Sequence, residues 1–276
     1  MLSDGNMRFA MLRNSRRVCR LGLATRGNTS LDRTSVEAAL DAGIDYLNWC
    51  GRTDGMREAI RNLGDMRRSV VIAVQLQSRT AQAARRELAS IKRDLHTDYI
   101  DVVTYYYVEE LAEWAEIIAP GGAAEVLEEE RAQGTITTIG LTTHQRLLAA
   151  QVAQSGRIDL LMIRYNAAHR GAEEEVFPIT RNCDISVVAF TCLRWGALLE
   201  STPQDPRNYV PPSAAQCYRF VLTHPDVSVA LMAPDGDEEL RENLAILENW
   251  HELGQDEFTS LAAHGQRVRL HAGSFP

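Results

Sequence analysis

The sequence predicts an α/β fold, a (β/α)8 TIM barrel preceded by a short N-terminal β-hairpin. Apolar runs bounded by turn residues alternate with longer amphipathic stretches, which is the pattern of strands followed by helices. This unit recurs eight times, the number that closes such a barrel. With 276 residues, 45% of them hydrophobic, the chain has the length of one barrel and can bury a large core. A doubly wound sheet is the alternative, but it rarely needs eight regular units.

The hairpin is the first expected element. Residues 7–18 predict two short strands that turn at Asn14-Ser15 and plug the floor of the barrel. The eight barrel strands are expected at 18–24, 44–49, 69–76, 98–105, 136–141, 158–164, 185–190 and 227–232. No linker rich in Ser, Gly or Pro divides the chain, so residues 1–276 are predicted to form a single domain.

Amphipathic helices are expected between the strands. The first, over 31–43, has apolar residues at helical spacing and ends at Gly43, a typical residue for the position after a helix C-cap. The same pattern recurs at 80–95, 123–134, 144–156 and 237–250.

Composition excludes several classes of protein. A net charge of −8 argues against a nucleic-acid-binding protein, which needs a basic face. The apolar runs are far shorter than the roughly 20 residues of a membrane-spanning helix, and no apolar signal segment opens the chain, so a cytoplasmic protein is expected. The five cysteines form no CxxC pair, and the seven histidines form no HxH or HExxH motif. We therefore expect reduced thiols, no metal site and no iron–sulfur cluster.

Six segments match, in order, blocks of one enzyme family. They are DAGIDYLNWCG at 41–51, TDYIDVVTYYY at 97–107, IGLTTH at 139–144, RIDLLMIRYN at 157–166, VVAFTCLRWGAL at 187–198 and ELRENLA at 239–245. Through them the sequence resembles the aldo-keto reductase superfamily, especially its bacterial branch. The resemblance implies a barrel with its site at the C-terminal mouth, and an NADP-dependent oxidoreductase that reduces carbonyl groups.

The resemblance also implies four catalytic residues, an Asp, a Tyr, a Lys and a His, and all four are substituted. The corresponding positions are Asn48, Thr53, Gln75 and Tyr106. Asn48 and Gln75 form a neutral pair, able to hydrogen-bond to each other, where the family has a buried ion pair. Without a nearby cation nothing lowers the pKa of a phenol, so the family's proton donation is not expected here.

The resemblance assigns cofactor contacts to a second set of positions. These are Thr142, Thr143, Met162, Phe190, Glu242 and Asn243. Phe190 keeps a ring for stacking on the nicotinamide, and Glu242 and Asn243 match the residues that hold the adenine. Met162 is a poor partner for an amide, and the acidic segment 234–239 replaces cations that the family often uses for the 2′-phosphate. We therefore expect NADP binding to be weak or absent.

Further chemistry-bearing residues follow the strand ends, where barrel enzymes place their sites. They are Cys50, Arg52, Asp54, His144, Arg164 and Arg194. Three arginines at one mouth suit a carboxylate or phosphate ligand, unless they pair with loop acids. Tyr106 with His144 suits an acid–base pair, although a run of three tyrosines also suits packing at the rim. Cys50 is a candidate nucleophile or a small buried apolar residue.

Three functional hypotheses follow from these residues. The leading one is a redirected enzyme of the superfamily, using non-standard acid–base chemistry such as dehydration, isomerisation or lyase cleavage on a small oxygenated substrate. The alternative is a non-catalytic ligand-binding or regulatory protein on the same fold. Ordinary NADPH-dependent carbonyl reduction is the third, if the alignment is wrong. The expected partner is a small molecule, and the arginines allow an anionic one.

Overall fold

A closed barrel of eight parallel strands is the centre of the molecule. The computed structural model describes residues 8–25 and 31–271. The barrel strands are β3 (Leu21–Thr25), β4 (Tyr46–Trp49), β5 (Val71–Leu76), β6 (Ile100–Tyr105), β7 (Ile136–Thr143), β8 (Leu160–Arg164), β9 (Ser186–Phe190) and β10 (Val227–Met232). Strands β1 (Phe9–Met11) and β2 (Arg17–Cys19) form an antiparallel hairpin before them. Each barrel strand pairs with the next, and β10 pairs with β3. The predicted TIM barrel and its N-terminal hairpin are confirmed.

One predicted strand, 18–24, is in fact parts of two strands from different sheets. Its first residues end β2 of the hairpin, and the remainder belongs to β3 of the barrel. Arg20 lies between them and is buried, and its guanidinium donates to the carbonyls of Leu222 at 2.7 Å and Val227 at 3.0 Å. Because apolar residues flank Arg20 on both sides, the sequence pattern reads as one run.

The hairpin closes the floor of the barrel. Leu12, which is 3% exposed, packs with the side chains that fill the barrel interior. The amide of Arg13 donates to Ser186 Oγ at 2.9 Å, where β9 begins, and Asn14 Nδ2 donates to Thr138 Oγ1 of β7 at 3.0 Å. Apolar contact and paired polar groups together seal this end, as predicted.

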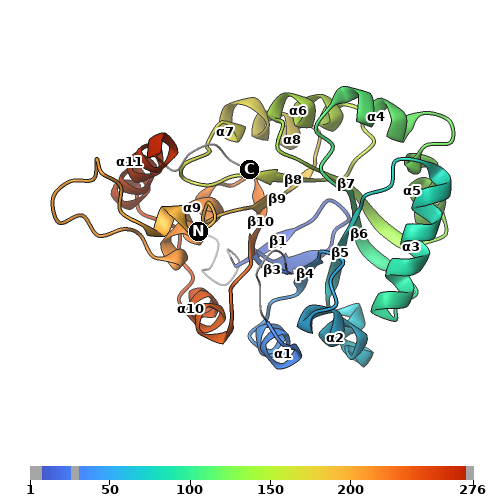
Figure 1. The fold of residues 1–276 in the computed structure, drawn as a ribbon, viewed down its shortest axis with the longest axis horizontal. Coiled ribbons are helices and arrows are strands. Elements are labelled where there is room, and N and C mark those ends of the chain that lie inside the picture. Colours follow the sequence, from blue (N-terminus) through green and yellow to red (C-terminus); the bar gives the residue numbers. More distant parts are fainter. Residues whose placement is uncertain (1–7, 26–30, 272–276) are drawn as a thin grey trace.

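Helices surround the strands on the outside (Figure 1). They are α1 (Arg33–Asp41), α2 (Gly55–Arg61), α3 (Ala81–Leu95), α4 (Leu111–Ile118), α5 (Ala123–Ala132), α6 (Arg146–Gln154), α7 (Ala172–Glu175), α8 (Phe177–Asn182), α9 (Ala214–Thr223), α10 (Asp237–Glu248) and α11 (Gln255–His271). Asp32 caps α1 by accepting from the amide of Ser35 at 2.8 Å, and Ser213 caps α9. Within residues 8–25 and 31–271, no helix combines the length and the apolar character needed to cross a membrane.

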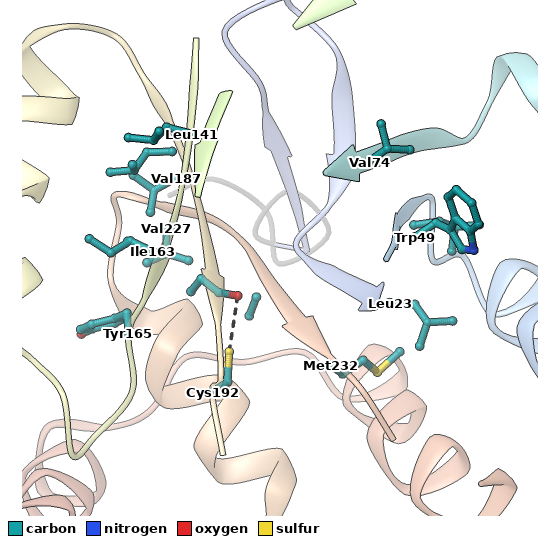
Figure 2. Close-up of a cluster of buried hydrophobic side chains, with 14 of the residues drawn as sticks. Leu23, Trp49, Val74, Leu141, Ile163, Tyr165, Val187, Cys192, Val227 and Met232 are labelled. Carbon is teal, nitrogen blue, oxygen red and sulfur yellow. Dashed lines mark hydrogen bonds between the residues drawn. The ribbon is translucent and has the colours of Figure 1, made fainter. Parts of the chain in front are cut away.

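Alternation of side chains along the strands produces two cores. Outward-facing residues such as Leu23 and Val74 pack against the helices, and Figure 2 shows part of this cluster. Inward-facing residues such as Tyr46 and Val188 fill the barrel. Toward the C-terminal strand ends three inward positions are polar, Asn48, Gln75 and Thr142, and they lie among apolar ones.

Candidate active site at the barrel mouth

A cavity of about 350 Å³ opens at the C-terminal mouth of the barrel, and we call it the mouth cavity. Its strand residues are Ala24, Asn48, Gln75, Thr142, Met162, Phe190 and Leu231. Its wall includes Cys50, Tyr107, Tyr218 and, from the loop after β9, Thr191, Cys192, Leu193, Trp195, Gly196 and Leu199. Ala233, Asp235 and Glu239 line its far end. The cavity size suits a small molecule.

Asn48 presents a polar group to this cavity without an internal partner. The side chain is 2% exposed, and its Nδ2 donates to Cys50 Sγ at 3.3 Å. Its Oδ1 is buried and has no hydrogen-bond partner among the described residues. Gln75 lines the same cavity but does not donate to that oxygen, so the expected satisfied Asn48–Gln75 pair is corrected. A ligand that donates a hydrogen bond would satisfy Asn48 Oδ1.

Tyr107, and not Tyr106, lines the mouth cavity, which corrects the predicted place of Tyr106. The amide of Tyr106 continues the β5–β6 ladder by donating to the carbonyl of Leu76 at 2.9 Å. Tyr107 then adopts a left-handed backbone with φ of +40°, which ends the alternation of the strand. The two rings stack with their centroids 4.1 Å apart.

A second cavity of about 500 Å³ lies beside the first, toward α2 and α3. It is lined by Trp49, Cys50, Gly51, Arg52, Val74, Gln75, Gln77, Glu87, Ser90, Ile91, Asp94 and Tyr106. Cys50 and Gln75 line both cavities and so form the partition between them. Arg52 belongs to this second cavity and is separated from the mouth cavity.

Five residues predicted at the mouth line neither cavity: Thr53, Asp54, His144, Arg164 and Arg194. Thr53 is exposed in the loop after β4. Asp54 is the N-cap of α2, where it accepts from the amide of Arg57 at 2.9 Å. The carboxylate of Asp54 therefore has a structural role, and the position that the resemblance assigns to the tyrosine carries no group facing the cavity.

A glutamate–histidine pair stands at the rim, next to the mouth cavity. His144 Nδ1 lies 3.0 Å from Glu109 Oε1, and the same oxygen accepts from the amide of His144 at 2.9 Å. Gln145 Nε2 donates to the other carboxylate oxygen of Glu109 at 3.0 Å. The imidazole packs on two residues of the cavity wall, with ring centroids 4.6 Å from Tyr107 and 5.4 Å from Phe190.

The environment of Glu109 fixes the tautomer of His144. Partial burial raises the pKa of the Glu109 carboxyl, but hydrogen bonds from His144 and Gln145 outweigh burial and hold the pKa below its ordinary value. An ionised carboxylate can only accept hydrogen bonds, so Nδ1 of His144 carries the proton. In the neutral ring the lone pair is therefore at Nε2. Sequence reasoning identified His144 but assigned no separate role to Glu109 or Tyr107, which follow β6. The available signal was the presence of acidic and phenolic residues just after that strand.

The other two predicted arginines, Arg164 and Arg194, come from the ends of two adjacent strands, β8 and β9. Arg164 ends β8 in register with Phe190, and Arg194 is 5% exposed in the loop after β9. Burial and then the charges of Arg164 and Arg194 lower the pKa of His169 to about 3. A loop acid, Glu109, lies close enough to Arg164 to raise its pKa in part, against burial and the neighbouring arginines.

The positions assigned to the cofactor divide into two groups. Met162, Phe190 and Thr142 line the mouth cavity, and the hydroxyl of Thr142 donates to Thr104 Oγ1 at 3.1 Å. Thr143 is buried on the other face of β7, where its Oγ1 accepts from the amide of Gln145. Glu242 and Asn243 belong to α10, one exposed and one buried, and neither lines the cavity.

The far end of the mouth cavity does not fit the 2′-phosphate of NADP. Asp235 and Glu239 line this end of the cavity. The amide of Asp235 donates to Glu239 Oε2 at 2.8 Å and so holds the Glu239 carboxylate at the cavity wall. Two carboxylates repel a phosphate dianion. Met162 in turn offers a thioether where an amide needs a hydrogen-bond partner. Within residues 8–25 and 31–271, no group of three or more His, Cys, Asp and Glu side chains is arranged to hold a metal ion.

Comparison with protein families gives one match. The model of the Aldo/keto reductase family matches residues 22–213. The NADH-specific methylglyoxal reductase of Escherichia coli (strain K12) is 25% identical over 200 residues, which span 60% of each chain. The uncharacterized oxidoreductase YrpG of Bacillus subtilis (strain 168) is 26% identical over 222 residues, 67% of this chain and 66% of that protein. The aligned part is thus less than two thirds of the length of either relative.

Solved structures share the fold. The holo form of aldo-keto reductase AKR11C1 from Bacillus halodurans superposes with a TM-score of 0.75 at 19% identity, covering 95% of this chain and 96% of that one. An aldo/keto reductase from Klebsiella pneumoniae in complex with NADP and acetate gives a TM-score of 0.76 at 18% identity, covering 94% and 95%. At these identities the likeness concerns the arrangement of the chain.

Proposed function

Since this chain belongs to the aldo/keto reductase family, we propose that it is a redirected member that performs acid–base chemistry on a small oxygenated substrate. The observation that carries the proposal is the Glu109–His144 contact at 3.0 Å, packed against Tyr107 and Phe190 of the mouth cavity. A base oriented by a carboxylate beside a small-molecule cavity is the arrangement that proton transfer requires.

The chemistry of this pair follows from the tautomer. Nε2 of His144 takes a proton from a carbon next to a carbonyl group of the substrate, and the electron pair of the broken C–H bond moves onto the carbonyl oxygen. The imidazolium that forms is stabilised by the Glu109 carboxylate. In a 2-hydroxycarbonyl compound, return of the proton to the former carbonyl carbon, with transfer of the hydroxyl proton to the former carbonyl oxygen, gives an isomerisation. Where a hydroxyl group is on the carbon β to the carbonyl, its loss together with the imidazolium proton as water gives a dehydration. Each step balances without an added oxidant or reductant.

The cavity residues orient the substrate in this proposal. Asn48 Oδ1 accepts from a hydroxyl group, and the Gln75 amide beside it offers both a donor and an acceptor. In this proposal the phenol of Tyr107, in the wall, donates to the carbonyl oxygen that gains charge. The name of the relative from Escherichia coli includes a small carbonyl compound, which supports the substrate class. The acidic far end repels the 2′-phosphate of NADP, and the proton transfers proposed here need no hydride donor.

Proton exchange tests the proposal directly. The full chain is incubated in D2O with a panel of small hydroxyaldehydes, hydroxyketones and 2-oxoacids, and deuterium incorporation or conversion is followed by NMR. His144→Gln is expected to lower the rate at least 100-fold, and Glu109→Gln between 10- and 100-fold, as is typical for loss of a general base or of its orienting group. His251→Gln, an exposed histidine on the surface, is the matched control and keeps the wild-type rate.

Three results contradict the proposal. Equal exchange rates in wild type and His144→Gln would remove His144 from the chemistry. Oxidation of NADPH coupled to carbonyl reduction, unaffected by His144→Gln, would instead indicate an ordinary reductase. Saturable binding of panel compounds with no exchange at any of them would favour the ligand-binding alternative.

A further inference from the structure

Four arginines and one neutral histidine, from five segments of the chain, gather at one side of the mouth. They are Arg146 at the start of α6, Arg164 at the end of β8, His169 before α7, Arg194 after β9 and Arg269 near the end of α11. Burial and then these arginines lower the pKa of His169 to about 3, so the imidazole is neutral at physiological pH. In a chain of net charge −8, this concentration of positive charge opposes the overall sign.

The fold holds the centre of this cluster next to the mouth cavity. Alternate residues of β8 face the barrel interior, so Arg164 lies on the same face as Met162, which lines the cavity, and one layer nearer the rim. Across the ladder Arg164 pairs with Phe190, and the Phe190 ring contacts His144. Arg164 therefore reaches the rim beside the proposed base.

The Asn166 side chain links the two segments that carry Arg164 and Arg194. Asn166 Nδ2 donates to the carbonyl of Thr191 at 2.8 Å, and Asn166 Oδ1 lies 3.3 Å from His169 Nδ1. Asn166 is fully buried, so this link fixes the loop after β8 against the loop after β9 that carries Arg194. The cations are held by the scaffold and not by long mobile segments.

The nearby acids already serve other partners. Glu109 accepts from His144 and Gln145, and Glu175 accepts from Arg146 Nε at 2.8 Å. Arg164 and Arg194 also make contacts within the chain, but a guanidinium has five N–H donors in a planar fork and can hold more than one acceptor. Partial burial strengthens its attraction for an anion.

We propose that Arg164 and Arg194 form an oxyanion anchor at the rim of the mouth cavity, which holds a carboxylate or phosphate group of the ligand. The inference rests on the proposed function, because the anchor binds the acid group of the same substrate whose reacting carbon faces His144. The substrate class is therefore a small hydroxy- or oxo-compound that carries an acid group. Arg146 and Arg269 add positive potential around the anchor without being needed as ligands.

Anion titrations of the full chain test the anchor independently of catalysis. Sulfate represents the tetrahedral oxyanion and acetate the carboxylate, each titrated by calorimetry at an ionic strength kept constant with potassium chloride. Arg164→Met is expected to weaken binding of the preferred anion at least tenfold, and Arg164→Lys less, because lysine keeps the charge but loses the fork. Arg86→Met, an exposed arginine on α3, is the matched control and stays within twofold of wild type.

The variants also separate this inference from the proposed function. His144→Gln is expected to keep anion affinity within threefold, whatever it does to proton exchange. Arg194→Gln repeats the test from the second side of the anchor, and circular dichroism verifies that each variant is folded. Preference for sulfate or for acetate identifies the acid group. The anchor is wrong if both anions bind folded Arg164→Met as tightly as wild type, or if Arg86→Met weakens binding to the same extent.

Discussion

The two ends of the barrel follow different rules. At the floor, Leu12 fills the interior and the polar groups of Arg13 and Asn14 find partners on β9 and β7. At the mouth, Asn48 Oδ1 is buried without a partner, and guanidinium groups are partly withdrawn from water. Satisfied contacts stabilise the folded chain, whereas unsatisfied buried groups reduce stability and are retained where they serve a ligand. Tyr46 Oη and Arg8 Nε are also buried without a hydrogen-bond partner in the described part of the chain, but Asn48 differs from them because it lines a cavity. The mouth therefore has room for a ligand where the floor is filled by Leu12.

Left-handed backbone occurs at both ends of the barrel. Thr191, Arg194 and Trp195 in the loop after β9, together with Tyr107 after β6, have φ between +40° and +56°. Each such residue that is not glycine costs on the order of 1 kcal/mol. These four line or adjoin the mouth cavity, whereas Ser15, with φ of +61°, forms the turn of the floor hairpin.

The largest expected effect comes from the floor. Leu12→Ala removes a side chain that is 3% exposed and leaves a space that the hairpin cannot fill, so the free energy of unfolding is expected to fall by about 3 kcal/mol. Urea unfolding measures this change. Met11→Ala, one residue away but 59% exposed, is the control and changes stability by less than about 0.5 kcal/mol. Equal losses in the two variants would mean that the hairpin does not plug the barrel.

A smaller effect is expected where the loop after β9 is clamped to α11. Asp205, whose side chain is 4% exposed, accepts from Arg267 Nε at 2.6 Å and lies 3.4 Å from His264 Nδ1. Burial raises its pKa, but the amide of Thr202, Arg267 and His264 lower it further, to about 2. A carboxyl with a lowered folded-state pKa stabilises the fold above its ordinary pKa, and this contribution is lost as the pH falls toward 2.

The clamp therefore predicts a specific dependence on pH. The difference in unfolding free energy between wild type and Asp205→Asn is expected to be about 2 kcal/mol at pH 6 and to shrink between about pH 4 and pH 2. Chemical unfolding across this range measures it. A difference that stays constant with pH would show that the carboxylate charge is not what holds the loop.

The next prediction concerns cofactor binding at the acidic end of the mouth cavity, and its expected free-energy difference is smaller than that for Asp205. NADPH is expected to bind at least tenfold more weakly than to a reductase with the usual contacts, about 1.4 kcal/mol, and no better than NADH. Glu239→Lys, at a position lining the cavity, should strengthen NADPH binding about fivefold, and added salt should reduce this gain. Glu238→Lys, the neighbour that does not line the cavity, is the control. Low-micromolar NADPH binding to wild type with preference over NADH would overturn the acidic-end argument.

The smallest expected effect tests the unsatisfied oxygen at the mouth. Asn48→Leu removes the buried Oδ1, so the free energy of unfolding without ligand is expected to rise by about 1 kcal/mol while ligand binding falls. Asn48→Asp is the opposite control, because a buried carboxylate without a cation destabilises the fold. Thermal unfolding separates the two. A loss of stability in Asn48→Leu would mean that the amide contributes to the fold as it stands.

Sequence patterns predicted the barrel well because strand alternation is a local property. The eight apolar runs and the turn at Asn14-Ser15 are visible within a few residues each, and the family blocks add their order. The division of 18–24 was missed because Arg20 is held by carbonyls about two hundred residues further along the chain. Local patterns carry no signal for such a partner.

Site residues were harder to predict for the same reason. Asn48, Gln75, Met162 and Phe190 lie at the mouth because strand periodicity continues through them. Tyr106 was assigned to the mouth through its alignment with the family's histidine position, and the alignment carries no signal that Tyr107 turns left-handed. The contact of His144 with Glu109 joins residues 35 positions apart through adjacent strand ends, and neither residue alone shows it.

The hairpin at the floor also sets an order of events for the newborn chain. Its residues are synthesised before those of the barrel, yet Asn14 meets its partner 124 residues later in the sequence and Arg13 meets its partner 173 residues later. The barrel bottom therefore stays open until β9 has been synthesised, and Leu12 remains accessible to chaperones while the barrel strands are made. The hairpin precedes the barrel in synthesis but docks after most of it, and closing so long a loop makes this step slow compared with formation of the neighbouring strand–helix units.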